Sequence, residues 1–135
     1  MKLSIYSDKD AKEIRQFFYT VFSESEGEEQ GLSVSTLVYD LMVKTDSKYL
    51  YGFTAIDNRE IIGCIFFSRL FFESGVIAYI LSPVAIHTRY QGKGVGQALI
   101  SFGIKNQKKT VLRCYLPTAV LSTSLVLAAS ILVLI

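Results

Sequence analysis

Apolar residues in the N-terminal half recur at intervals of three and four, which predicts two amphipathic helices. The apolar positions of the first helix are Ile14, Phe17, Phe18, Val21 and Phe22. Those of the second helix are Val34, Leu37, Val38, Leu41 and Met42. A short strand over residues 2–6 precedes them, and the acidic run SESEGEEQG at residues 23–31 is expected to form a solvated loop between the two helices.

The middle of the chain changes to apolar runs that are separated by turn residues. Strands are predicted over residues 49–57, 61–72 and 76–86, with turns at DNRE and at Ser74–Gly75. Pro83 cannot donate a backbone hydrogen bond, so it predicts a bulge or an edge within the third of these strands. A third helix is expected to run to about Gln107. This order predicts an α+β fold, in which a mixed, mainly antiparallel sheet carries helices on both faces.

The stretch RYQGKGVGQALI places three glycines, Gly92, Gly94 and Gly96, directly before the third helix. The phosphate-binding pattern GxxxxGK[ST] does not fit, and neither does the dinucleotide pattern GxGxxG. The order of strand, glycine turn and helix nevertheless suits an anion. The first N–H groups of a helix have no partner within it, and glycines without a Cβ let an anion approach them closely. Arg89 and Lys93 add positive charge, so we interpret this loop as a site for phosphate or diphosphate. The alternative is a connector whose glycines only allow tight packing.

Composition narrows the remaining classes of function. The chain has 135 residues, half of them apolar, and a net charge of +2, which favours one domain and argues against a nucleic-acid partner. The two cysteines, Cys64 and Cys114, lie in strand-like surroundings, and one histidine, His87, offers no metal-ligand spacing. We therefore expect a reduced, cytoplasmic protein without a metal.

The residues VAIHTRYQGKGVGQALI resemble the central motif of the GCN5-related N-acetyltransferase (GNAT) superfamily. Its signature [RQ]-x-x-G-x-[GA] is matched by Gln91, Gly94 and Gly96, and the order of elements up to about residue 108 also agrees. The resemblance implies the acyl-CoA N-acyltransferase fold and acetyl-CoA as the acyl donor. It assigns the pantetheine arm to the exposed backbone of Val84, Ala85 and Ile86. It assigns the diphosphate to the loop and its flanks: Arg89, Gln91, Gly92, Lys93, Gly94, Val95, Gly96 and Gln97.

The resemblance also implies direct attack of a primary amine on the thioester, with a backbone N–H of the fourth strand stabilising the oxyanion. The family often uses a Glu near the central strands as the base and a Tyr on a later helix as the acid. No Glu lies within this fourth strand, since Glu73 precedes it. Tyr79 and Ser82 are the nearest candidates for a catalytic role, although both also fit as sheet residues. His87 lies at the strand's end, where the family has no fixed catalytic residue.

The chain departs from the family pattern after the third helix. We divide it into a truncated GNAT-like core, residues 1–112, and an apolar tail, residues 113–135, which is uncharged from Cys114 onward. TVLRCYL fits a strand, but no Tyr-bearing helix or closing hairpin follows. One explanation is a membrane anchor behind Lys108, Lys109 and Arg113. The other, which we favour, is a shift of the reading frame. Codons permitted for residues 110–119, read one base earlier, can encode DGVEVLLTYG, which resembles the family's fifth strand.

These patterns predict an acetyl-CoA-dependent N-acetyltransferase that acts on a primary amine, with weak or absent turnover because the later strands and the catalytic Tyr are missing. The alternatives are a non-catalytic protein that binds CoA or another anion, and a tail-anchored, membrane-associated protein. A homodimer is left open, and the sequence does not identify the acceptor.

Overall fold

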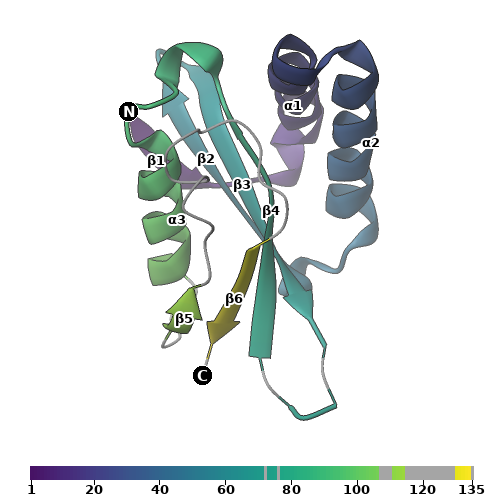
Figure 1. Cartoon of the computed structure of the whole chain (residues 1–135), viewed down its shortest axis with the longest axis vertical. Helices are drawn as coiled ribbons and strands as arrows, with labels where there is room; N and C mark the ends of the chain where they lie inside the picture. Colours follow the sequence, from purple (N-terminus) through teal and green to yellow (C-terminus); the bar gives the residue numbers. More distant parts are fainter. Residues whose placement is uncertain (72, 76, 107–110, 115–129, 135) are drawn as a thin grey trace.

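The computed structural model describes residues 1–71, 73–75, 77–106, 111–114 and 130–134 (Figure 1). The helices are α1 (Ala11–Glu26), α2 (Glu28–Lys44) and α3 (Val95–Asn106). The strands are β1 (Lys2–Ile5), β2 (Leu50–Asp57), β3 (Glu60–Leu70), β4 (Ile77–Ile86), β5 (Val111–Cys114) and β6 (Ser130–Leu134). Short 3-10 turns are η1 (Asp8–Asp10), η2 (Ser47–Tyr49) and η3 (Thr88–Tyr90).

The strands form one sheet in the order β1-β2-β3-β4-β6-β5, and each neighbouring pair is antiparallel. Helices α1 and α2 cover one face of this sheet and α3 covers the other (Figure 1). The predicted α+β class, with a mainly antiparallel sheet between helices, is therefore confirmed.

Side chains that alternate along the central strands build a separate core on each face of the sheet. Cys64 and Phe66 of β3 point to the α1–α2 side, where they join the predicted apolar stripe of α1. Ile65 and Phe67, their neighbours along the strand, point to the α3 side. This period-two alternation places both helical layers against a single sheet, with α3 beside the end of β4.

The acidic run at residues 23–31 is helical, and the predicted loop is wrong. Helix α1 continues to Glu26 and α2 begins at Glu28, so Gly27, with a φ of 98°, is the whole connection. Glutamate is a good helix former, and Glu28 and Glu29 in the first turn of α2 favour the helix dipole. Gly31 is buried, and a Cβ there would lie 2.8 Å from the carbonyl oxygen of Tyr19, so a glycine at this position lets α1 and α2 pack closely.

Part of the predicted tail lies in the sheet. Strand β6 pairs with β4 over residues 77–81 on one side and with β5 on the other. Residues 115–129, which make up most of the rest of the tail, lie outside the described part. Among the described residues, no helix has the length and apolar character needed to cross a membrane.

The thiol of Cys64 is expected to be unreactive in the folded protein. Its side chain is fully buried, and desolvation of the thiolate raises the thiol's pKa above the ordinary value. The native state therefore keeps this proton as the pH rises through the ordinary thiol range. In a Cys114→Ser background, iodoacetamide at about pH 8.5 should leave Cys64 unmodified and should modify it in urea. Rapid alkylation without denaturant would contradict the buried placement.

Candidate functional site

Strand β4 has two parts that differ in their neighbours. Ile65 of β3 pairs with Val84, but Phe67 pairs with Leu81, so Ser82 and Pro83 together oppose the single residue Phe66. This is the bulge that Pro83 predicted. Before the bulge, β4 is hydrogen-bonded on both sides; after it, β4 pairs only with β3 among the described residues.

The direction of the free backbone groups follows from the register. The N–H of His87 donates to the carbonyl of Ile62 on β3, at 2.8 Å. Alternate residues of a strand direct their polar groups to opposite sides, so Ala85 faces β3 as His87 does, while Val84 and Ile86 face away from it. The side-chain amide of Gln91 donates to the Ile86 carbonyl at 3.1 Å, which agrees with this alternation. Val84 and the N–H of Ile86 thus present main-chain groups on a side of β4 that no described strand pairs with, which we call its open side.

The glycine loop follows directly and ends at the start of α3. Gly92 and Gly94 have φ values of 75° and 83°, which other residues rarely adopt. The first backbone bond of α3 runs from the N–H of Ala98 to the carbonyl of Gly94, at 3.0 Å. The N–H groups of residues 95–97 therefore have no acceptor within the helix, and they lie at the positive end of its dipole. A Cβ on Gly96 would lie 4.0 Å from Ile86, so these donors are adjacent to the open stretch of β4.

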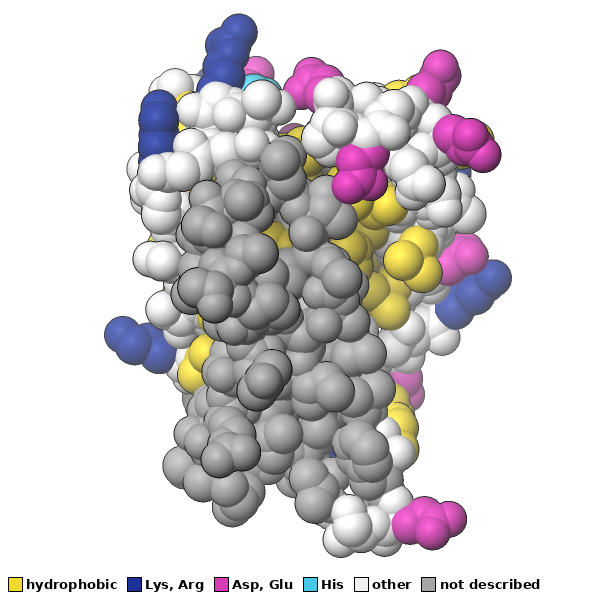
Figure 2. All heavy atoms as spheres, in the orientation of Figure 1, with side chains coloured by type: hydrophobic (Ala, Val, Ile, Leu, Met, Phe, Trp, Pro, Cys, Tyr) yellow, Lys and Arg dark blue, Asp and Glu magenta, His cyan; other side chains and the backbone are white. Residues whose placement is uncertain are grey.

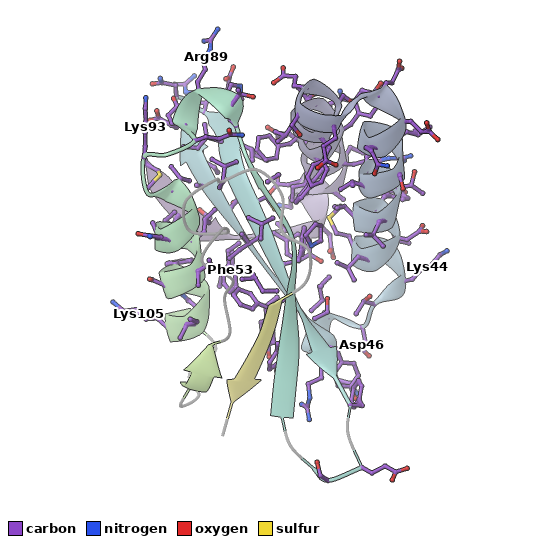
Figure 3. All side chains as sticks on the ribbon, in the orientation of Figure 1. Lys44, Asp46, Phe53, Arg89, Lys93 and Lys105 are labelled. Atoms are coloured by element: carbon purple, nitrogen blue, oxygen red, sulfur yellow. The ribbon has the colours of Figure 1, made fainter. Side chains whose placement is uncertain are left out.

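The glycine loop and the turn before it carry two basic residues. Arg89 and Lys93 are exposed, and their side chains lie at the same end of the molecule (Figure 3). In the same orientation, Figure 2 shows basic side chains over this end of α3 and acidic ones over the adjoining end of the α1–α2 layer. The loop end of α3 is thus suited to an anion.

Side chains from both layers hold the segment between β4 and the loop. Thr88 donates to the carboxylate of Glu24 on α1 at 2.7 Å. The N–H of Arg89 donates to Nδ1 of His87 at 3.1 Å. The hydroxyl of Tyr90 donates to Oδ2 of Asp57 at 2.7 Å, and this bond raises the pKa of Tyr90, so the hydroxyl stays protonated. The loop therefore begins from a segment tied to α1 and to β2.

A family model described as the acetyltransferase (GNAT) domain matches residues 49–129, which include β2, β3, β4, the glycine loop and α3. The chain belongs to the GNAT acetyltransferase family. No curated protein matches the chain.

Solved structures with the GNAT arrangement are similar in fold. A GNAT family acetyltransferase from Brucella melitensis in complex with acetyl-CoA is 23% identical with a TM-score of 0.62, over 87% of this chain and 78% of that one. A possible acetyltransferase from Clostridium difficile 630 is 19% identical with a TM-score of 0.60, over 78% of this chain and 69% of that one. An aminoglycoside 6'-N-acetyltransferase complexed with coenzyme A has the same identity and TM-score, over 78% of this chain but 54% of that one.

The GNAT structure brings the predicted cofactor residues together, with Ser82 in the bulge next to Val84 and Tyr79 farther along β4. Tyr79 is 2% exposed, and its ring packs edge-on against Tyr51 at 5.6 Å, before the bulge. The side chain of Ser82 lies outside the described part. Glu73 is exposed in the β3–β4 turn, and the ten residues of β4 separate it from the loop by about 30 Å. His87 is half-buried and accepts the Arg89 N–H, so this ring nitrogen is already engaged.

Sequence reasoning did not single out several residues that shape the GNAT site. A Cβ on Gly63 of β3 would lie 2.9 Å from Leu99 and 3.1 Å from both Ile86 and Val95. Gly63 therefore lets the first turns of α3 approach the sheet closely enough to place the loop beside β4. Tyr90 and Asp57 were also missed, because they lie 33 residues apart and no local pattern joins them.

A metal centre and a hollow between the first two helices are the other kinds of site to compare with this one. Within the described residues, no group of three or more His, Cys, Asp or Glu side chains could hold a metal ion. A hollow of about 420 Å³ lies between α1 and α2 and is lined by residues that include Lys12, Arg15, Tyr19 and Tyr39. It borders neither β4 nor the glycine loop, so it is separate from the site described above.

Proposed function

We propose that this chain is an acetyl-CoA-dependent N-acetyltransferase in which β4 and the glycine loop bind the cofactor. The observation that carries the proposal is the adjacency of two sets of main-chain groups that have no partner among the described residues. The open side of β4 at Val84 and Ile86 leads directly to the free N–H groups at the start of α3. Family membership and the Brucella melitensis structure in complex with acetyl-CoA support this reading.

Each part of coenzyme A has a chemical counterpart along this surface. The diphosphate would accept hydrogen bonds from the N–H groups of residues 92–97, with Arg89 and Lys93 adding positive charge. The amides of the pantetheine arm would pair with the open backbone of Val84 and Ile86, as an added strand does. The thioester would then lie toward the bulge at Pro83, at the end of this stretch farthest from the loop.

In the proposed reaction, the lone pair of a neutral primary amine attacks the thioester carbonyl carbon, and a β4 N–H stabilises the oxyanion. The C–S bond then breaks, coenzyme A leaves as the thiolate, and the proton that the amine nitrogen loses passes through water to that thiolate. Exposed carboxylates at the α1–α2 connection, of which Glu24 contacts Thr88, make that side of the site favourable for a cationic acceptor.

Calorimetry can test the cofactor proposal. Coenzyme A is expected to bind at least about tenfold more tightly than inorganic pyrophosphate, because the pantetheine arm adds contacts along β4. Equal affinities would indicate a generic anion site, and no binding of either would refute the proposal. Acetyl transfer to a panel of primary amines is expected to be weak or absent, because the sequence pattern after α3 departs from that of the family. Turnover at rates usual for enzymes would contradict that second part.

A further inference from the structure

Tyr90 connects the segment just before the glycine loop to the turn of the β2–β3 hairpin. It is the last residue of η3 and comes two residues before Gly92. Its hydroxyl donates to Asp57, the last residue of β2, at a distance of 2.7 Å. The second carboxylate oxygen of Asp57 lies 3.8 Å from the amino group of Met1, so this carboxylate faces a cation as well as the tyrosine. A short bond to a charged acceptor is among the stronger hydrogen bonds in proteins.

The ring of Tyr90 has two neighbours of its own, His87 and Lys93. The imidazole of His87, at the end of β4, packs edge-on against it with ring centroids 5.9 Å apart. The ammonium of Lys93 lies 5.7 Å from the centre of the ring. Tyr90 thus contacts His87, the first residue after β4, and Lys93, the cation between Gly92 and Gly94.

Such a tether matters because Gly92 and Gly94 have no side chains that could anchor the loop. Gly92 and Gly94 have open space where a side chain would stand, and glycine gains more backbone freedom in a mobile chain than any other residue. If the loop became ordered only when the ligand bound, the lost backbone entropy would weaken binding. A loop that the protein already holds in shape avoids this loss.

We propose that Tyr90 is a positioning residue that holds the glycine loop, through Asp57, in the shape that receives the cofactor's diphosphate. This inference rests on the function proposed above. In this inference Tyr90 does not contact the reacting atoms. Its hydroxyl is expected to affect only the binding of the diphosphate end of the ligand.

The experiment compares two ligands across a small set of variants. Tyr90→Phe removes only the hydroxyl and is expected to weaken coenzyme A binding roughly fivefold, within the range for one hydrogen bond. Pantetheine, which has the amide arm without the diphosphate, should bind the variant as it binds the wild type. Asp57→Ala should repeat the effect, Asp57→Asn should restore part of it, and the double variant should lose no more than either single one. Tyr19→Phe is the matched control, because it removes a comparable bond, of 3.0 Å to Glu28, between the two helices on the other face of the sheet.

A second measurement keeps the inference testable without any ligand. NMR relaxation of the free protein should show lower order parameters for the backbone amides of residues 91–96 in Tyr90→Phe than in the wild type and in Tyr19→Phe. If the wild type binds no coenzyme A, the proposed function fails, and the order parameters still decide about the tether. Unchanged order parameters, wild-type affinity for coenzyme A, or equal losses for coenzyme A and pantetheine would each overturn the inference.

Discussion

Replacing Gly94 with alanine is expected to weaken coenzyme A binding by at least about tenfold. Gly94 has a φ of 83°, where an alanine costs about 1–2 kcal/mol, and about 1.4 kcal/mol corresponds to a factor of ten in affinity. A Cβ at this position would meet no other atom within 4 Å, so the effect arises from the backbone and not from a clash. If residue 94 returned to a negative φ, the N–H groups at the start of α3 would rotate away from the position proposed for the diphosphate.

Gly75→Ala is the matched control for this substitution. Gly75 has a φ of 80° and equally open surroundings, but it lies in the β3–β4 turn at the other end of β4. Both variants should lose similar stability in thermal unfolding, while calorimetry should show weakened coenzyme A binding for Gly94→Ala alone. Parallel losses of affinity in the two variants would show that the loop geometry is not specific to the ligand.

Replacing Phe53 with alanine is expected to lower the free energy of unfolding by about 3–5 kcal/mol. Phe53 is 1% exposed, and its ring packs edge-on against Phe67 at 5.9 Å and against Phe102 of α3 at 5.6 Å (Figure 3). Its removal leaves a cavity between the sheet and α3, which is the helix whose first turn carries the loop donors. Because a domain is stable by only about 5–15 kcal/mol, coenzyme A binding should decline with the folded fraction.

Urea unfolding followed by circular dichroism measures this loss. Phe71→Ala is the control, since Phe71 is 67% exposed and packs mainly against Tyr49, at 4.9 Å. Its loss should be less than about 1 kcal/mol. A Phe53→Ala variant that unfolds at the same urea concentration as the wild type would show that α3 does not depend on this contact.

Helix and strand periods in the sequence were sufficient for most of the fold. The stripe from Ile14 to Phe22 and the apolar runs of β2, β3 and β4 bury the side chains that their periods predicted, and Pro83 marks the bulge. The glycine loop and the start of α3 were also found locally, because a strand end, three glycines and an apolar helix stand next to one another in the chain. The prediction for residues 23–31 was wrong because their charge was interpreted as the mark of a loop. Glutamates are also compatible with the ends of helices, as they are here in α1 and α2.

The sequence by itself therefore determined most of the elements from β1 to α3, their class and the position of the glycine loop, because those features depend on neighbours within a few residues. It did not predict β6, which lies in the segment interpreted as a tail. Only the tertiary structure decided which backbone groups of β4 face away from β3, since this depends on the register of the pairing between the two strands. It alone joined Tyr90 to Asp57 and brought Gly63 against α3, because contacts between distant residues leave no periodic signal in a single chain.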